Sequence, residues 1–230
     1  MAFVKRIHLN CFDKIKNDNE HLSLNENNFG KPTNIIQFGN KVIIVDSYKH
    51  QIRIVSLVQN YFIIDKIIGN GKGFKNGHFE TVQFNCPISA VVLNEKTLLV
   101  TDSGNCCIRI VSLDLEIVNT LNNSFRLYAK YNDYGHFIEI ISFYKIIPKK
   151  LLKLLNGELL LIDKNSHEIT QISKDLEKTK SIMCEYDENN DSSANESFGK
   201  SKFIMPKDFV QRKDGSILII DGFLRLQEIR

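Results

Sequence analysis

The stretch VDSYKHQIRIVSL, residues 45–57, decides the fold, because the chain carries nearly the same line again as TDSGNCCIRIVSL at residues 101–113. Eight of the thirteen letters match in register, and the two copies begin 56 residues apart. Self-similarity at a fixed period is the signature of repeat architectures, in which one supersecondary unit recurs along the chain. The sequence on either side of the two copies shows the limits of the unit and two further copies.

The four prolines of the chain all occupy the same place in the repeated unit. Each is followed 14 or 15 residues later by an aspartate that ends an aliphatic run: KVIIVD, TLLVTD, ELLLID or SILIID. The pairs are Pro32 with Asp46, Pro87 with Asp102, Pro148 with Asp163, and Pro206 with Asp221. This spacing predicts four units, at approximately 29–68, 84–121, 144–184 and 203–230, within a single domain that spans residues 1–230.

Each unit can be interpreted as a small antiparallel sheet. Proline lacks an N–H and suits the entry to a strand, and a turn rich in Gly, Asn or Asp separates that strand from the aliphatic run. The run is too continuously apolar for a strand with one wet face, so both of its faces should be buried. Two further strand-like segments follow in the first two units. Four antiparallel strands at this period describe a blade of an all-β propeller, and the shorter coils of a β-helix fit less well.

The second unit resembles the NHL-repeat family of β-propellers. The stretch GNGKGFKNGHFETVQFNCPISAVVLNEKTLLVTDSGNCCIRIVSL, residues 69–113, is similar to the family's Gly-rich lead-in, F-N-x-P entry, D-x-G-N turn and I-R-x-I strand. The first copy departs from this pattern at the turn, and the third and fourth copies lack the I-R-I strand. The resemblance implies structural roles. Asp102, Gly104 and Asn105 would form a strand-to-strand turn, and Arg109 would pair with an acidic group on the next strand or blade; Asp46 and Arg53 would act likewise.

The number of units leaves two architectures open. NHL-like propellers most often have six blades, so four units predict either a closed four-bladed ring or a fragment of a larger propeller. The segment FVKRIHL, residues 3–9, would supply the missing outer strand of the last blade in the first case, or belong to a lost upstream blade in the second. Two stretches break the period. Residues 122–143 are aromatic-rich and predict an extra strand pair or a surface loop, and the acidic residues 185–200 predict a loop.

Composition excludes several classes of function. A net charge of +3 over 230 residues gives no global field that would attract DNA or a membrane surface. The chain has no apolar run near the roughly 20 residues of a membrane helix, and its start lacks the apolar core of a signal peptide. Five cysteines without a C-x-x-C predict free thiols in a reducing compartment, so we expect a cytoplasmic protein.

Three functions remain, and the first is favoured. A non-catalytic propeller would serve as a scaffold that presents its loops to a protein partner, with no cofactor. Single-stranded RNA is the alternative partner, bound by a basic face with one aromatic residue; the candidates are Tyr144, Lys145, Lys149, Lys150 and Lys153. Some related propellers are metal-dependent lactonases or lyases. Their ligand positions, two residues after each proline, would be Asn34, Ser89, Lys150 and Asp208, of which only Asp208 is a strong cation ligand.

Overall fold

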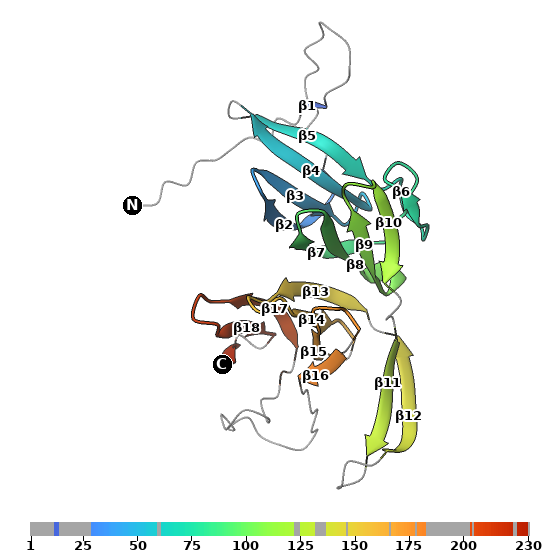
Figure 1. The fold of residues 1–230 in the computed structure, drawn as a ribbon, viewed down its shortest axis with the longest axis vertical. Helices are drawn as coiled ribbons and strands as arrows, with labels where there is room; N and C mark the ends of the chain where they lie inside the picture. Colours follow the sequence, from blue (N-terminus) through green and yellow to red (C-terminus); the bar gives the residue numbers. More distant parts are fainter. Residues whose placement is uncertain are drawn as a thin grey trace, which may run out of the picture.

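In the described residues the computed structural model is nearly all β, with four blade sheets in chain order and a separate two-stranded hairpin (Figure 1). It describes residues 12–13, 29–58, 61–121, 125–131, 137–145, 147–165, 167–177, 179–182, 203, 205–222 and 225–229. The acidic stretch 185–200 and the N-terminal residues 3–9 lie outside these ranges, so the expectations for both remain predictions. No helix in the described ranges is long and apolar enough to cross a membrane.

The two N-terminal sheets correspond to the first two repeat units, which we call blades 1 and 2. Blade 1 consists of β2 (Pro32–Phe38), β3 (Lys41–Asp46), β4 (Gln51–Val58) and β5 (Tyr61–Ile68), with the short β1 (Phe12–Asp13) added in parallel to β5. Blade 2 consists of β7 (Pro87–Asn94), β8 (Thr97–Asp102), β9 (Cys107–Ser112) and β10 (Ile117–Leu121), with β6 (Gly77–His78) on its outer edge. A single turn of 3-10 helix, η1 (Ser103–Asn105), links β8 to β9.

The third and fourth units form blades 3 and 4. Blade 3 consists of β13 (Pro148–Lys153), β14 (Leu159–Asp163), β15 (Ile169–Ile172) and β16 (Thr179–Ile182). Blade 4 has three described strands, β17 (Pro206–Gln211), β18 (Ile217–Asp221) and β19 (Arg225–Ile229). Between blades 2 and 3, β11 (Phe125–Tyr131) and β12 (Phe137–Lys145) form a separate antiparallel hairpin, so most of the aromatic-rich insert is an extra strand pair.

The constant spacing of proline and aspartate has a direct structural cause. In every blade the proline that opens the first strand is the cross-strand partner of the aspartate that ends the second: Pro32 faces Asp46, Pro87 faces Asp102, Pro148 faces Asp163, and Pro206 faces Asp221. Each first strand also carries an irregularity in register just after its proline. The number of residues between the proline and the aspartate is therefore set by the length of the hairpin that joins them.

The blades stack face to face through their apolar side chains. One core cluster fills the space between blades 1 and 2, a second lies between blades 2 and 3, and a third between blades 3 and 4. The first strands β2, β7, β13 and β17 lie side by side along the inside of the stack. Phe84 and Phe203, three residues before their prolines, are buried in the first and third of these clusters.

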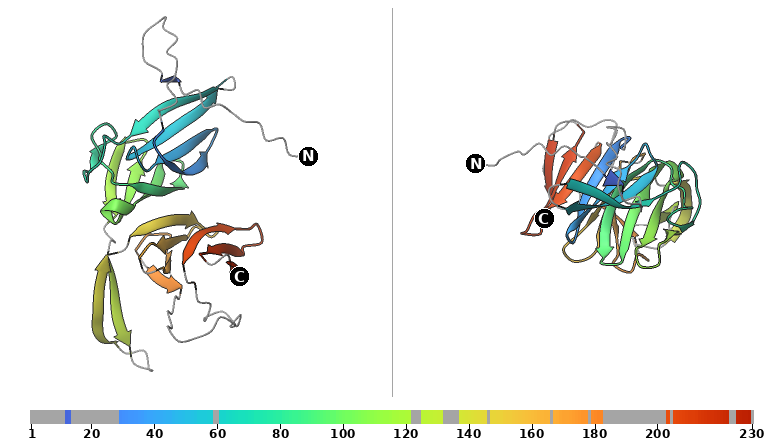
Figure 2. Two further views of the ribbon diagram at one scale, coloured as in Figure 1. Left: turned by 180° about the vertical axis from the view of Figure 1, so that it is seen from behind. Right: turned by 90° about the horizontal axis from the view of Figure 1, so that it is seen from above.

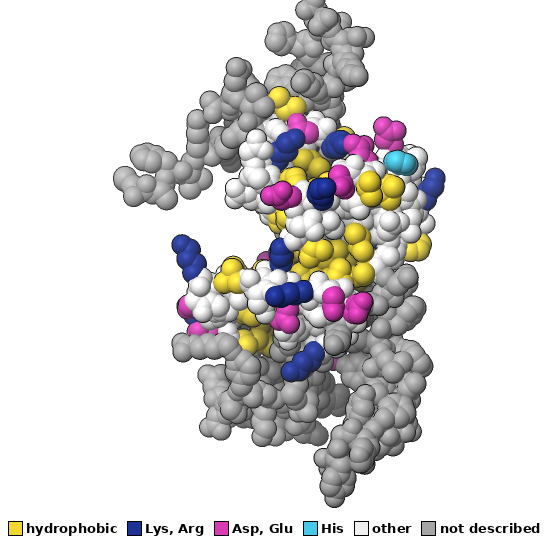
Figure 3. All heavy atoms as spheres, viewed as in Figure 1, with side chains coloured by type: hydrophobic (Ala, Val, Ile, Leu, Met, Phe, Trp, Pro, Cys, Tyr) yellow, Lys and Arg dark blue, Asp and Glu magenta, His cyan; other side chains and the backbone are white. Residues whose placement is uncertain are grey.

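The four blades form an arc whose two end blades do not stack on each other in the described part of the chain. Blades 1 and 2 make up the upper half of the molecule in Figure 1, and blades 3 and 4 the lower half, with blade 4 below blade 1. Figure 2 shows the same arrangement from behind and from above. In the space-filling view the surface is hollowed between the two halves, where hydrophobic side chains gather (Figure 3).

Candidate functional site

The aspartate that ends each second strand is buried and holds the segment that precedes the proline, which we call the lead-in. Asp102 is fully buried, and its carboxylate accepts hydrogen bonds from Asn85 N (2.7 Å), Asn105 Nδ2 (2.8 Å) and Arg109 Nη1 (2.9 Å). Burial raises the pKa of the Asp102 carboxyl, and these three donors oppose that rise. The carboxylate of Asp102 therefore joins the lead-in, the turn and the third strand through the hydrogen bonds that it accepts.

The other three aspartates make the equivalent contact with their own lead-ins. Asp46 accepts from Gly30 N at 2.8 Å and Lys31 N at 3.0 Å, and Asp163 accepts from Ile147 N at 3.3 Å. Asp221 accepts from Met205 N at 2.6 Å. Each donor stands one or two residues before a proline, which cannot donate itself. All four carboxylates are therefore engaged in holding the chain at one rim of the blades.

Arg109 pairs with Asp102 of its own turn, whereas the resemblance to the NHL-repeat family implied an acidic partner on the next strand or blade. Besides the contact with Asp102, it donates to Gln83 O (3.0 Å), Lys75 O (2.9 Å) and Asn76 Oδ1 (2.8 Å). Its guanidinium also lies 5.1 Å from the centroid of the Phe84 ring. The two Nη atoms of Arg109 thus bond to groups of the protein itself, and these bonds hold the lead-in of blade 2 in place.

Arg53 occupies the equivalent place in blade 1 with a longer ion pair. Its Nη2 lies 3.8 Å from Asp46 Oδ2 and donates to Gln51 Oε1 at 3.1 Å, and its guanidinium lies 4.5 Å from the ring centroid of Phe29. Phe29 is three residues before Pro32, as Phe84 is before Pro87. The arginine–phenylalanine contact therefore recurs in both complete copies of the sequence motif.

Gly104 and Asn105 shape the turn after Asp102. Gly104 N donates to Asn85 O at 2.8 Å, and Asn105 Nδ2 reaches Gly73 O at 2.8 Å as well as the aspartate. A Cβ added at Gly104 would lie 2.6 Å from Asn85 O, so only glycine fits against the lead-in there. The D-x-G-N turn is thus a docking point for the blade's own lead-in.

The four positions proposed as metal ligands lie in a row on the first strands and take part in contacts between blades. Asn34 Oδ1 accepts from Ala90 N at 2.9 Å, and Ser89 Oγ accepts from Leu151 N at 3.4 Å. Lys150 Nζ lies 3.1 Å from Asp208 Oδ1. Across the described ranges, no group of three or more His, Cys, Asp or Glu side chains could hold a metal ion. The ammonium group of Lys150, which pairs with Asp208, would repel a divalent cation at that carboxylate.

Of the lysines proposed for RNA binding, Lys149, Lys150 and Lys153 contact neighbouring blades. Lys149 Nζ donates to Pro206 O at 3.4 Å, and Lys153 Nζ donates to Leu93 O at 2.5 Å. Burial lowers the pKa of Lys149, and the charge of Lys207 lowers it further. Tyr144 and Lys145 end β12 of the hairpin, in a segment whose side chains are not described.

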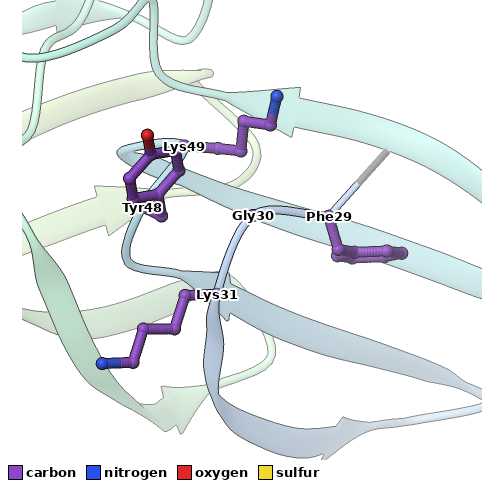
Figure 4. Close-up of a pocket in the computed structure, with 5 residues that line it drawn as sticks. All are labelled: Phe29, Gly30, Lys31, Tyr48 and Lys49. Atoms are coloured by element: carbon purple, nitrogen blue, oxygen red, sulfur yellow. The ribbon is translucent and has the colours of Figure 1, made fainter. Parts of the chain in front are cut away.

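A different group of aromatic and basic residues gathers at the rim that the aspartates hold. We call Lys31, Tyr48, Lys49, Lys72 and Phe74 the aromatic–basic rim. Figure 4 shows an open pocket of blade 1 lined by Phe29, Gly30 and three members of this rim, with both lysine side chains extending outward. Lys72 lies near enough to His50 to lower its pKa, together with burial, which is the larger cause. Phe74 stacks 5.3 Å from the Arg109 guanidinium, beside the equivalent turn of blade 2.

Sequence reasoning did not single out this rim. Its signal was present in the first copy, where Tyr48 and Lys49 replace the Gly104 and Asn105 of the second. Tyr48 and Lys49 add large side chains at positions where blade 2 forms its turn with a glycine and an asparagine.

Comparison with known proteins supports the repeat assignment over part of the chain. No family model matches. The NHL repeat-containing protein 2 of Gallus gallus is 35% identical over 92 residues, which cover 40% of this chain and 12% of that protein. The match therefore spans a small part of the relative's length.

Among solved structures, two similar ones cover most of the chain. The extracellular domain of a one-component system from B. thetaiotaomicron matches with a TM-score of 0.50 at 15% identity. The match covers 97% of this chain and 26% of the B. thetaiotaomicron chain. The WD40 β-propeller domain of Doa1 has a TM-score of 0.49 at 10% identity, over 86% of this chain and 50% of that one. With its four stacked blades the chain has a β-propeller fold, and over 92 residues it is similar to an NHL repeat-containing protein.

Proposed function

We propose that the chain is a non-catalytic, cytoplasmic β-propeller scaffold that binds a protein partner through the aromatic–basic rim. The observation that carries the proposal is the combination of exposed rings and fixed backbone at this rim. Tyr48 is 73% exposed and Phe74 is 61% exposed, although both are large and apolar enough to be buried. Both stand on segments that buried aspartates or arginines hold in place.

The backbone beneath Tyr48 is held on both sides. Asp46 accepts from Lys49 N at 3.1 Å as well as from Gly30 N and Lys31 N, so the turn and the lead-in share one buried carboxylate. Phe74 follows Gly73, whose N–H donates to Phe84 O at 2.9 Å. A partner would therefore meet loops that lose little conformational entropy on binding. Tyrosine on a rigid support is among the residues that contribute most to protein interfaces.

The charge of the rim predicts the chemistry of the partner. Lys31 and Lys49 line one pocket with Tyr48, and Lys72 lies two residues before Phe74, so an acidic segment with at least one apolar side chain would match the surface. Single-stranded RNA offers negative charge and stacking bases as well, and it is the competing partner. An enzyme is less well supported, because Asn34, Ser89, Lys150 and Asp208 use their side chains in contacts within and between blades.

Affinity purification from cells that express the chain tests the proposal. A protein partner should co-purify with the wild type and should bind the purified chain directly. The paired change Tyr48→Ala and Phe74→Ala should weaken that direct binding by at least about tenfold, since each ring is an anchor candidate. As matched controls, Leu115→Ala and Leu155→Ala remove exposed apolar side chains elsewhere and should leave binding unchanged.

The same purification distinguishes the competing functions. Binding that survives the paired ring change would place the contact elsewhere and contradict the proposal. Recovery of RNA in place of a protein, lost after nuclease treatment, would favour the RNA reading. A hydrolytic or lyase activity abolished by Asp208→Asn would favour the enzyme.

A further inference from the structure

The third strand of blade 3 has no arginine at the position where the first two blades carry one. The cross-strand partner of the residue two places before the aspartate is Arg53 in blade 1 and Arg109 in blade 2. In blade 3 the same register places Thr170 opposite Leu161, two residues before Asp163. Blade 3 therefore keeps the buried aspartate of the unit and carries a hydroxyl group in place of the arginine.

The carboxylate of Asp163 uses one of its two oxygens to hold its own blade. Oδ1 accepts from Ile147 N at 3.3 Å and from Asn165 N at 2.8 Å, so it joins the lead-in to the turn. Oδ2 is buried and has no hydrogen-bond partner in the described residues. In blades 1 and 2 the aspartate Oδ2 is the oxygen that faces the guanidinium, 3.8 Å from Arg53 Nη2 and 2.9 Å from Arg109 Nη1.

Two further side chains with oxygen atoms stand at equivalent positions of blade 3. The Oγ1 atom of Thr170 is buried and, like Asp163 Oδ2, has no hydrogen-bond partner among the described residues. Glu168, whose backbone oxygen accepts from Asp163 N, is the counterpart of Gln51, and Gln51 Oε1 accepts from Arg53 Nη2 at 3.1 Å. Glu168 is buried and has a further contact of its own, so the two available acceptors are Asp163 Oδ2 and Thr170 Oγ1.

A buried carboxylate oxygen favours a cation that donates hydrogen bonds to it. Asp163 is 2% exposed and Thr170 is 1% exposed, so bulk water cannot solvate either group. A buried polar group without a partner is costly, and a buried charge costs more unless it is both paired and hydrogen-bonded. The guanidinium group meets both needs, because it is a permanent cation with five N–H donors in a planar fork.

The guanidinium positions of blades 1 and 2 lie close to the surface of the molecule. The Arg53 guanidinium is 4.5 Å from the ring centroid of Phe29, which lines the open pocket of Figure 4. The Arg109 guanidinium is 5.3 Å from the ring centroid of Phe74, which is 61% exposed. Each guanidinium thus contacts a ring that itself reaches the surface. A group that enters from outside blade 3 would have to pass a single side chain to reach the equivalent position.

We propose that Asp163 and Thr170 form a binding site for the guanidinium group of a ligand, which takes the position that Arg53 and Arg109 occupy in their own blades. The ligand is either an arginine side chain of a bound protein or a free guanidinium compound. A calcium ion would need six to eight oxygen ligands, more than the two available acceptors. The site is separate from the aromatic–basic rim and does not depend on the function proposed for that surface.

Thermal unfolding in the presence of methylguanidinium chloride tests the inference. At about ten times its dissociation constant, a ligand that binds only the folded chain should raise the unfolding temperature by about 3–5 °C. The same concentration of methylammonium chloride is the control and should have a smaller effect. Asp163→Asn keeps an acceptor for Ile147 N but loses the charge, so it should abolish the response. Thr170→Arg supplies the guanidinium from the third strand, so it should raise the unfolding temperature without ligand and also abolish the response.

Blade 2 provides a matched positive control. Arg109→Thr reproduces in blade 2 the combination of Asp163 and Thr170, because it leaves Asp102 opposite a threonine. This variant should unfold at a lower temperature than the wild type, and methylguanidinium should restore part of the loss. The comparison shows how large a response one guanidinium position of this kind gives.

Two arginine probes distinguish the sources of the group in isothermal titration calorimetry. N-acetyl-arginine amide represents a free compound, and a blocked pentapeptide with a central arginine represents a protein segment. Binding of the peptide at least as tight as that of the amide assigns the site to a protein, and binding of the amide alone assigns it to a small molecule. N-acetyl-lysine amide should bind at least about tenfold more weakly, because its ammonium group lacks the planar fork.

Three results would overturn the proposal. The first is a wild type that responds equally to methylguanidinium and methylammonium, or to neither. The second is a response that Asp163→Asn leaves unchanged. The third concerns the hairpin before Pro148, which carries the cations Arg126, Lys130 and Lys145. If methionine at one of these positions lowers the unfolding temperature as much as Arg109→Met does, the chain itself supplies the cation.

Discussion

Arg109 Nη1 lies 2.9 Å from Asp102 Oδ2, and neither side chain is exposed to solvent. Buried ion pairs of this kind compensate the cost of desolvation only when further hydrogen bonds satisfy both partners. Here Asn85 N and Asn105 supply donors to the carboxylate, and two backbone carbonyls and Asn76 supply acceptors to Nη1 and Nη2 of the guanidinium, whereas the buried Nε has no hydrogen-bond partner in the described residues. The pair therefore fastens the lead-in of blade 2 to its second and third strands.

Arg109→Met should lower the free energy of unfolding by about 3–5 kcal/mol, because it leaves the Asp102 carboxylate buried without its cation. Urea unfolding followed by circular dichroism measures the loss. Arg212→Met is the matched control. Arg212 pairs with Glu228 at 2.5 Å on the surface, where an ion pair contributes about 1 kcal/mol or less. Equal losses for the two variants would mean that the buried network adds nothing beyond a surface pair.

Gly104→Ala should destabilise the chain by about 1–3 kcal/mol through overpacking. Its Cβ would lie 2.5 Å from Asn85 Cγ and 2.6 Å from Asn85 O, and the lead-in backbone would have to shift. Gly39→Asn provides the control, because Gly39 has open space around it and a φ of +59° that asparagine tolerates. Thermal unfolding should separate the two. A Gly104→Ala chain that unfolds at the wild-type temperature would show that the turn has room to relax.

The imidazole of His50 makes the contact between blades 1 and 2 depend on pH. Cys86 N donates to His50 Nδ1 at 2.9 Å, so the contact needs Nδ1 to be unprotonated. Burial, and then the charge of Lys72, lower the pKa of His50 from its ordinary value of 6.5. A histidine whose pKa is lower in the folded state contributes stability that is present above pH 6.5 and is lost as the pH falls through the folded value.

We therefore expect His50→Asn to flatten the acid side of the stability profile. Asparagine suits the φ of +58° at this position and offers an amide oxygen to Cys86 N without titrating. The measurement is the free energy of unfolding of both chains at several pH values from neutral to mildly acidic. Parallel losses in wild type and variant over this range would assign the acid sensitivity to other groups.

The sequence predicted the blades well because their determinants are local. Pro32 and Asp46 lie within one hairpin, and so do the equivalent pairs, so spacing along the chain translates directly into pairing across strands. The alternation of Ile43, Ile44 and Val45 between two clusters likewise follows from the period of a strand with both faces buried.

What the sequence could not supply is the contacts between blades. Asn34 and Ala90 are 56 residues apart, and no pattern within either unit shows that one accepts a hydrogen bond from the other. The same holds for Lys150 and Asp208: the sequence pattern suggests an RNA face for the first and a metal position for the second, and it gives no sign of their ion pair. Whether the end blades meet is also a matter of how far each blade rotates, and this small angle is not encoded in any single motif.

Binding of RNA by the lysines of blade 3 is best tested with variants that keep the contacts between blades. Replacing Lys149, Lys150 and Lys153 by glutamate would place new charges beside Pro206 O, Asp208 and Leu93 O, so lost binding could reflect damaged blade contacts. Glutamine at these three positions removes the charge and keeps a donor. Glutamine at Lys31, Lys49 and Lys72 is the matched triple change at the aromatic–basic rim.

We expect only weak binding of a labelled oligouridine at physiological salt, because a net charge of +3 supplies little attraction. Fluorescence anisotropy over a salt series measures both the affinity and the number of phosphates neutralised. What weak binding there is should fall with the rim triple and remain with the blade 3 triple, since the blade 3 ammonium groups already contact neighbouring blades. A micromolar or tighter complex that only the blade 3 triple abolishes would instead identify the chain as a single-stranded RNA-binding propeller.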